Sequence, residues 1–156
     1  MSSGRIPELI TAALERIARL FRRQPGGPEH LHTGRKGEDM AYYFLRRQGY
    51  TIVARNWRCK GRKGEVDLIG WDGKTLCFIE VKTRRSHAVA TAESAVDRAK
   101  QVELRGMASL FLRNQHPAPQ SRFDVVSIYL VPGTEPQIDL FKDAFSWRTM
   151  SEKRRR

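Results

Sequence analysis

The order of elements in this 156-residue chain predicts an α/β fold with a mixed β-sheet flanked by helices. A segment with helical periodicity over residues 34–48 precedes three strand-like runs over residues 51–83. A second helical segment over residues 91–114 is followed by a strand over residues 122–131 and a short one over residues 137–141. A chain of this length can bury a sizeable core as one domain with tails.

The N-terminal segment has its own pattern. Apolar residues recur at helical spacing over residues 6–23, with arginines outside the stripe, and a Pro/Gly run at residues 25–28 ends it. We therefore expect residues 1–32 to form an amphipathic helix with a Pro/Gly linker, residues 33–150 the main domain, and residues 151–156 a basic tail. Docking of this helix on its own chain or on a partner is favoured, and an anionic membrane surface is the alternative.

The first helix of the main domain is expected over residues 34–48, capped by Thr33 and ended by Gly49. Glu38 lies in its first turn, where the helix dipole favours an acid. Capping is the simple explanation for Glu38. A strand over residues 51–57 follows.

The next two strands form a β-hairpin that contains three unexpected charges. Residues 65–71 and 75–83 are rich in β-branched and aromatic residues, and Asp72-Gly73-Lys74 is the turn between them. Because side chains alternate along a strand, Glu80 and Lys82 share a face with Phe78. Such charges are costly to bury unless they are paired or bound to a metal.

Asp67, Glu80 and Lys82 suit the hydrolysis of a phosphodiester. The two carboxylates can hold one Mg²⁺, for which Mn²⁺ can substitute, and the backbone carbonyl of Val81 can add a ligand. Lys82 would then lie beside the ion, where it could orient or deprotonate a water or offset charge on the phosphorane. Twelve residues separate Asp67 from Glu80, enough for a strand end, a tight turn and a return strand.

Basic residues flank this hairpin. The loop over residues 55–63 holds five basic residues, no acidic one and Trp57, which we expect to pack in the core. Lysine and arginine suit phosphate contacts, whereas a solvated charged loop is the simpler interpretation. Residues expected to contact nucleic acid are Arg58, Lys60, Arg62, Lys63, Arg84, Arg85, Lys100 and Gln101.

Lys100 interrupts an apolar stripe on the helix expected over residues 91–114. The stripe consists of Val96, Lys100, Leu104, Ala108 and Phe111. Snorkelling of Lys100 to the helix edge and contact of Lys100 with a phosphate fit this pattern equally well. Further on, both faces of residues 122–131 are apolar, which favours a central strand, and residues 143–145 are expected to form a helical turn.

The net charge of the chain indicates which class of molecule it binds. The formal charge is +12, of which residues 33–150 carry +7, since residues 1–32 contribute +2 and the last six residues +3. Such a field favours a polyanion such as nucleic acid, with a solubilising surface as the alternative. The two cysteines and four histidines have no metal or disulfide spacing, and no segment is apolar enough for stable membrane insertion. Without an apolar signal region the expected compartment is the cytoplasm.

Several short motifs occur in a fixed order along the chain. They are Gly34-x-x-Gly37-Glu38-x-x-Ala41-x-x-Phe44-Leu45, Gly49-Tyr50-x-Ile52, Asn56-x-Arg58, Gly64-Glu65-Val66-Asp67-Leu68-Ile69, Phe78-Ile79-Glu80-Val81-Lys82-x-Arg84 and Arg122-Phe123-Asp124-Val125-Val126. Together they resemble the bacterial YraN family, a branch related to archaeal Holliday-junction resolvases. Asp67 with Glu80-Val81-Lys82 resembles the PD-(D/E)xK signature of restriction-endonuclease-like nucleases. Val66 replaces the proline of that signature, and Arg105 replaces the tyrosine expected four residues after Gln101 in RecB-like nucleases.

This resemblance, from residue 34 to residue 145, implies a restriction-endonuclease-like three-layer sandwich with a central mixed sheet. It implies a Mg²⁺-dependent endonuclease acting on DNA, including branched or non-duplex DNA, in which Glu38 completes the metal site. A nucleic-acid-binding module without turnover is the alternative. Resolvases of the related group are dimers, so a homodimer is a further expectation, although no residue signals one.

Overall fold

The computed structural model describes residues 29–85 and 96–148, with side chains from Gly34 onward. Two helices and five strands lie in these ranges: α2 (Glu29–Arg47), β1 (Thr51–Trp57), β2 (Val66–Asp72), β3 (Thr75–Arg84), α3 (Arg98–Leu112), β4 (Ser121–Tyr129) and β5 (Gln137–Phe145). The helix expected over residues 6–23, its linker and the tail over residues 151–156 lie outside the described residues. Neither described helix is both long and apolar enough to cross a membrane.

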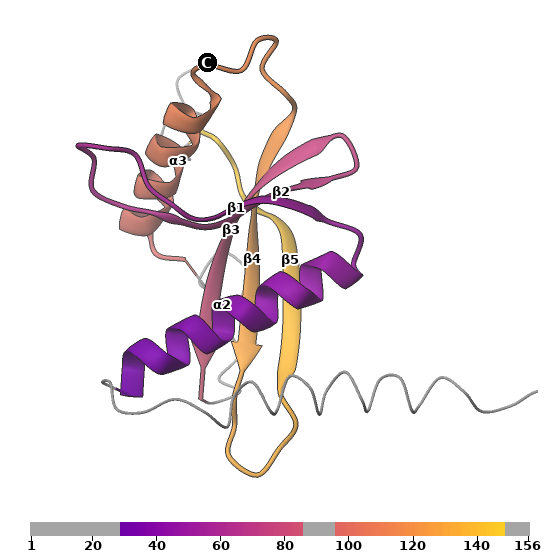
Figure 1. The fold of residues 1–156 in the computed structure, drawn as a ribbon. Helices are drawn as coiled ribbons and strands as arrows, with labels where there is room; N and C mark the ends of the chain where they lie inside the picture. Colours follow the sequence, from indigo (N-terminus) through magenta and orange to yellow (C-terminus); the bar gives the residue numbers. More distant parts are fainter. Residues whose placement is uncertain (1–28, 86–95, 149–156) are drawn as a thin grey trace, which may run out of the picture. The chain divides into compact units, whose positions relative to one another are not determined.

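The strands form one sheet in the order β1-β2-β3-β4-β5 (Figure 1). Only β3 and β4 pair in parallel, and the other neighbours are antiparallel. The connection between these two parallel strands contains α3, as a parallel pair requires a crossover. The predicted α/β fold with a mixed sheet is therefore confirmed, and β4 is an interior strand, paired with β3 on one side and β5 on the other.

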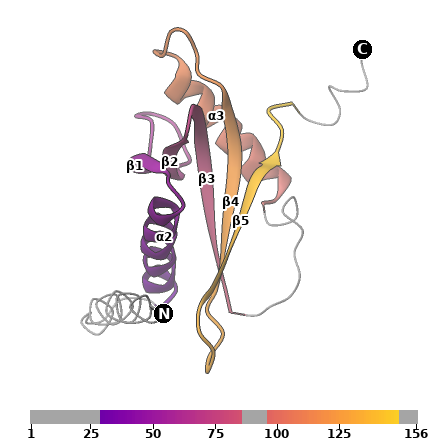
Figure 2. The ribbon, with the colours of Figure 1, turned by 90° about the vertical axis from the view of Figure 1, so that its right-hand side faces the viewer.

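Two cores lie on opposite faces of the sheet because successive side chains of a strand alternate. One face packs on α3 through Leu104, Met107 and Ala108, with Phe78 and Phe123 from the sheet. The other packs on α2, and its buried residues are Ala41, Leu45, Tyr50, Leu68, Cys77, Ile79, Val126 and Ile128. The turned view in Figure 2 shows the sheet edge-on with α2 beside it. One helix thus covers each face.

The ends of the helices differ from the sequence prediction. Helix α2 begins at Glu29, so Thr33 lies inside it and is not its cap. Helix α3 begins at Arg98, later than the predicted residue 91, because the side chain of Asp97 accepts a hydrogen bond from the backbone N–H of Lys100 at 2.8 Å and caps the helix. This cap places Lys100 in the first turn.

The last strand is longer than predicted. Strand β5 continues through residues 143–145, where we expected a helical turn. The pairing with β4 shifts register between Phe123 and Val125, and Asp143 adopts a left-handed φ of 53° there. Three residues of β5, 142–144, stand opposite Asp124 alone, and local periodicity cannot anticipate such an irregularity. It lets Phe145 stack on Phe123, with ring centroids 4.7 Å apart.

Candidate active site at a fork in the sheet

Strands β2 and β3 separate before β3 ends. Their pairing runs from Asp72–Thr75 to Leu68–Ile79 and goes no further. Beyond Ile79, β3 stays paired with β4 as far as Arg84. On the other side of the fork, β2 stays paired with β1 as far as Val66, its first residue. The sheet therefore forks at residues 67 and 80, so Asp67 and Glu80 lie at the point of separation.

The two acids of the fork face each other. Extending the β2–β3 register by one residue puts Asp67 opposite Glu80, and directly opposed residues of antiparallel strands point to the same face. The Oδ2 atom of Asp67 accepts a hydrogen bond from the backbone N–H of Val81 at 2.7 Å. The carboxylate thus bonds a β3 amide just beyond the point where pairing to β2 ends. Asp67 and Glu80 thus lie on one face of the sheet at the end of the β2–β3 pairing.

Glu80 is the most buried charge of the fork, with 4% of its side chain exposed. Its Oε1 atom lies 2.8 Å from Nζ of Lys82, and its Oε2 atom lies 3.5 Å from Nζ of Lys100. The second contact is an ion pair without a hydrogen bond, and Oε2 has no hydrogen-bond partner among the described residues. We call Asp67, Glu80, Lys82 and Lys100 the fork cluster.

Electrostatics in the fork cluster disfavour two ionised acids. Burial and the charge of Glu80 raise the pKa of Asp67 to about 7, against the lowering effects of the Val81 hydrogen bond and of Lys100. Like charges at close range resist joint ionisation. In the absence of a cation, the pair therefore tends to keep a proton.

Lys100 reaches the fork from α3 and holds the start of β2. Its Nζ lies 2.8 Å from Oε1 of Glu103, one turn on, and donates to the carbonyl of Glu65 at 3.4 Å. Burial lowers the pKa of Lys100, but its hydrogen bond to Glu103 and the charge of Glu80 outweigh that effect and raise it. The hydrogen bond from Lys100 lowers the pKa of Glu103. Lys100 therefore donates to two acceptors, Glu103 and the Glu65 carbonyl, and forms a longer ion pair with Glu80.

Glu38 approaches the fork from the other helix. Helix α2 crosses β3 closely at Gly37, where a Cβ atom would lie 2.0 Å from Oγ1 of Thr83. Glu38 accepts a hydrogen bond at Oε2 from the side chain of Asn56 at 2.9 Å. Burial and the charge of Glu65 raise the pKa of Glu38, and Glu38 in turn contributes to the raised pKa of Asp67. The structure thus brings Glu38 near the acid pair.

The donor set of the fork fits a hard divalent cation in part. Within the described ranges no three His, Cys, Asp or Glu side chains are close enough together to hold a metal ion. Asp67 and Glu80 supply two carboxylates, and Oε2 of Glu80 is buried without a hydrogen bond. Mg²⁺ commonly binds through one or two carboxylates and retains several waters. Asp67 and Glu80 would therefore supply two of the oxygen ligands of such an ion, and waters or other groups the rest.

The basic loop after β1 lies next to α3. The Cβ position of Gly64 is 2.6 Å from Cγ of Glu103, so the end of the loop packs against the residue that binds Lys100. Arg58 bonds Glu65 through its Nε atom at 2.8 Å. Lys60, Arg62 and Lys63 are exposed. Trp57 packs into the α3-side core against Phe111, as predicted.

The remaining basic residues have different surroundings. Arg84 is half-buried at the end of β3, with an Nε atom that has no hydrogen-bond partner in the described part of the chain, and Arg85 is exposed. Gln101 donates to the carbonyl of Val96 at 3.0 Å and accepts from Arg105 at 3.2 Å. These bonds tie Gln101 to the start of α3, and its phosphate contact stays a prediction.

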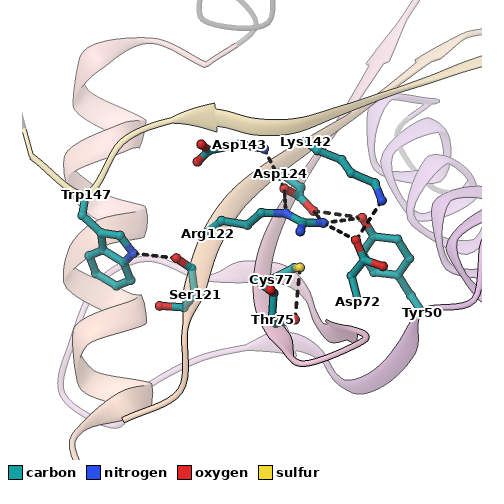
Figure 3. Close-up of polar contacts among 10 residues, drawn as sticks. All are labelled: Tyr50, Asp72, Thr75, Cys77, Ser121, Arg122, Asp124, Lys142, Asp143 and Trp147. Atoms are coloured by element: carbon teal, nitrogen blue, oxygen red, sulfur yellow. Dashed lines mark hydrogen bonds and ion pairs between the residues drawn. The ribbon is translucent and has the colours of Figure 1, made fainter.

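A second charged group lies at the opposite end of β2, on the α2 face (Figure 3). Asp124 is fully buried and bonds Arg122 at 2.8 Å, the hydroxyl of Tyr50 at 3.1 Å and the backbone N–H of Asp143 at 2.9 Å. Arg122 also donates to Asp72 at 2.6 Å, and Lys142 reaches the same carboxylate at 2.8 Å. We call Tyr50, Asp72, Arg122, Asp124 and Lys142 the Asp124 network.

The charges of the Asp124 network are matched. Hydrogen bonds from Lys142 and Arg122 lower the pKa of Asp72. Bonding to Asp124 raises the pKa of Arg122, and burial with the nearby Asp124 charge raises that of Tyr50. Burial raises the pKa of the neighbouring Cys77 thiol to about 12, and its sulfur lies 3.5 Å from the Thr75 carbonyl. Within the part of the chain that the structure describes, each charged group of this network has an ion-pair partner.

Sequence reasoning did not assign this network or Glu103. A charged residue two positions from another, as Arg122 is from Asp124, places both on one strand face and was the available signal. Glu103 follows Lys100 at helical spacing. Both signals concern pairs within one element, whereas the contacts to Tyr50, Asp72 and Glu65 depend on the fold.

Several bacterial proteins named UPF0102 are similar in sequence to this chain. A UPF0102 protein of Koribacter versatilis is 52% identical over 122 residues, which cover 78% of this chain and 85% of that protein. A UPF0102 protein of Nocardia farcinica is 49% identical over 113 residues, covering 72% and 87%. A UPF0102 protein of Solibacter usitatus is 43% identical over 133 residues, covering 85% and 97%.

The family match includes the fork. The sequence model of the uncharacterised protein family UPF0102 matches residues 37–128, from the helix turn that carries Glu38 to the end of β4. Asp67, Glu80, Lys82 and Lys100 all fall in this range. The resemblance to the YraN family is thereby confirmed, and the chain belongs to the uncharacterised protein family UPF0102.

Proposed function

We propose that this protein is a Mg²⁺-dependent endonuclease that hydrolyses phosphodiester bonds in DNA, including branched or non-duplex DNA. The fork cluster is the observation that carries the proposal: two opposed buried carboxylates, one with an unbonded oxygen, lie beside an ammonium group. Arrangements of this kind are costly in a folded protein, so a role for the charges is a better explanation than packing. The resemblance to PD-(D/E)xK nucleases supports the same reaction.

Each residue of the fork has a proposed task. Asp67 and Glu80 would hold the ion, with the Val81 carbonyl and Glu38 as supporting oxygen groups. When bound, Mg²⁺ or Mn²⁺ supplies positive charge to the scissile phosphate and makes a bound water more acidic. Lys82, with 36% of its side chain exposed, would orient the attacking water or stabilise charge on the phosphorane.

The basic residues would hold the substrate. Lys60, Arg62 and Lys63 are exposed on a loop whose end packs on α3 beside the fork, and Arg84 and Arg85 follow Lys82 at the end of β3. Contacts of such residues with phosphates position a backbone without reading its sequence. The positive net charge would speed association with DNA at low salt.

A panel of linear, flapped, single-stranded and four-way DNA substrates with Mg²⁺ or Mn²⁺ tests the proposal. We expect cleavage of at least one substrate, and Asp67→Ala should lower its rate by about a thousandfold or more while DNA binding is retained. Glu135→Ala removes an exposed acid from a turn and should cleave like wild type. Equal trace cleavage by wild type and Asp67→Ala would refute the nuclease activity.

One observation favours a second function, that of a nucleic-acid-binding module without turnover. Glu80 already has two lysine neighbours, so its charge is compensated without an ion. Calorimetric titration of Mg²⁺ with and without DNA separates the two. No metal-dependent heat in either titration, together with salt-sensitive DNA binding, would favour the module.

A further inference from the structure

Lys100 contacts two acids in the fork region, Glu103 and Glu80, and this double contact suggests a role that Lys82 does not have. Its ammonium group forms its short contact, 2.8 Å, with Glu103 and its long contact, 3.5 Å, with Glu80. The geometry around Glu80 therefore combines a buried oxygen with no hydrogen bond and a cation held mainly by another acid.

We propose that the ammonium group of Lys100 competes with divalent cations for the carboxylate of Glu80. It stays beside Glu80 until an ion displaces it. This inference rests on the proposed metal-dependent function. A positive charge this close to Glu80 opposes a second cation at the same oxygen, because the site is largely removed from water. Lys100 thus sets the affinity of the fork cluster for Mg²⁺ as a positioning residue.

The displacement is inexpensive because Lys100 does not lose its partners. When the ammonium group moves away from Glu80, Glu103 and the carbonyl of Glu65 still accept its hydrogen bonds. The Asp97 cap fixes the backbone of Lys100 in the first turn of α3, so only the side chain needs to move. No buried charge is left unpaired at any stage, which is the usual obstacle to such a movement.

A structural role for Lys100 is the competing explanation. Lys100 and Glu103 both contact the backbone of Glu65. Lys100 donates to the Glu65 carbonyl, and Glu103 accepts from the Glu65 N–H. They could therefore simply clamp the start of β2. Under that explanation, loss of either residue loosens the fork, and both variants lower metal affinity. The two roles thus predict different signs for one measurement.

The test is calorimetric titration of Mg²⁺ alone into the metal-stripped full chain, at about pH 8, where Asp67 is mostly ionised. We expect Lys100→Gln to tighten the dissociation constant by about tenfold, and Glu103→Gln to weaken it by about threefold, because the released ammonium moves closer to Glu80. Arg98→Gln removes an exposed charge from the same turn and should stay within about twofold of wild type. Lys100→Arg should also resemble wild type.

Weaker or unchanged binding in Lys100→Gln, relative to Arg98→Gln, would overturn the inference. Shifts of the same sign in Lys100→Gln and Glu103→Gln would also overturn it in favour of the clamp. If wild type cleaves DNA but its affinities follow neither order, the inference fails and the nuclease function stands. If no variant binds Mg²⁺, both fail, whereas binding by Lys100→Gln and not by wild type supports the competitor.

Discussion

The fork cluster and the Asp124 network are two buried charged groups at opposite ends of β2, and they are built differently. Asp124 has an arginine, a tyrosine hydroxyl and a backbone N–H as partners, and each bond has good geometry. Glu80 has two lysines and yet an oxygen without a hydrogen bond, and it faces another acid. Buried polar groups in stable cores are normally satisfied. The difference separates a group whose buried acid is fully hydrogen-bonded from one whose buried acid has an oxygen without a hydrogen bond among the described residues.

Removing a partner from the Asp124 network should have the largest effect on stability. Arg122→Met leaves the fully buried Asp124 without its cation and Asp72 with one partner fewer. We expect a loss of about 4 kcal/mol in the free energy of unfolding, measured by urea denaturation. A loss below about 1 kcal/mol would contradict the structural role of the network.

Neutralising an acid of the fork cluster should raise the free energy of unfolding, whereas the change in the Asp124 network lowers it. The pKa of Asp67 is raised from 3.8 to about 7, so the folded state binds a proton more tightly than the unfolded state. Stability is therefore lost as pH rises through this range, and the ionised carboxylate is a cost above it. Asp67→Asn should match wild type near pH 4 and exceed it by about 3 kcal/mol near pH 8, without metal.

Denaturation curves at several pH values, in a chelating buffer, check this prediction. The variant retains an oxygen that can accept from the Val81 N–H, so only the charge differs. A difference between Asp67→Asn and wild type that does not grow with pH would show that the two acids are not coupled.

The close crossing of α2 and β3 should have an intermediate effect. Gly37→Ala places a methyl group against Thr83, whereas Gly34→Ala on the same helix meets nothing within 4 Å. We expect Gly34→Ala to gain up to about 1 kcal/mol from helix propensity and Gly37→Ala to lose about 2 kcal/mol relative to it. Thermal denaturation of the two variants measures the difference. Equal stabilities would mean that Thr83 rotates away at no cost.

The outer pair of the Asp124 network should matter least. Lys142 is half exposed, and Asp72 keeps its bond to Arg122 when Lys142 is removed. Lys142→Ala should therefore lower the free energy of unfolding by about 0.5 kcal/mol, an effect reduced further in high salt. A loss as large as that of Arg122→Met would show that the network does not divide into a buried and an exposed part.

Much of the fold could be predicted from local sequence patterns. The hairpin that carries Asp67 and Glu80, the central strand β4 and the inward stripe of α3 follow from side-chain periodicity and turn residues. The ends of elements were predicted less well. Helix α3 starts at the Asp97 cap and β5 continues through an irregularity at Asp143, and a hydrogen bond from a backbone N–H to an aspartate side chain lies at each place.

The site could be predicted as a set of residues but not as a geometry. Strand alternation put Glu80 and Lys82 on one face, and the hairpin spacing put Asp67 opposite. Other features depend on contacts between elements distant in the sequence. These are the fork, the hydrogen bond from Val81 to Asp67 and the contacts that Lys100 makes. Periodicity carries no information about such contacts. The pattern could therefore not show that Lys100 contacts Glu65, Glu103 and Glu80, and its phosphate contact stays a prediction.

The bond from the Val81 amide to Asp67 has a consequence for observing the protein at work. This amide lies just beyond the last β2–β3 pair, and Asp67, not β2, accepts its hydrogen bond. Its proton exchange with solvent and its NMR chemical shift therefore report directly on the charge and occupation of that carboxylate. If an ion binds as proposed, this one backbone resonance would follow its arrival without any DNA substrate.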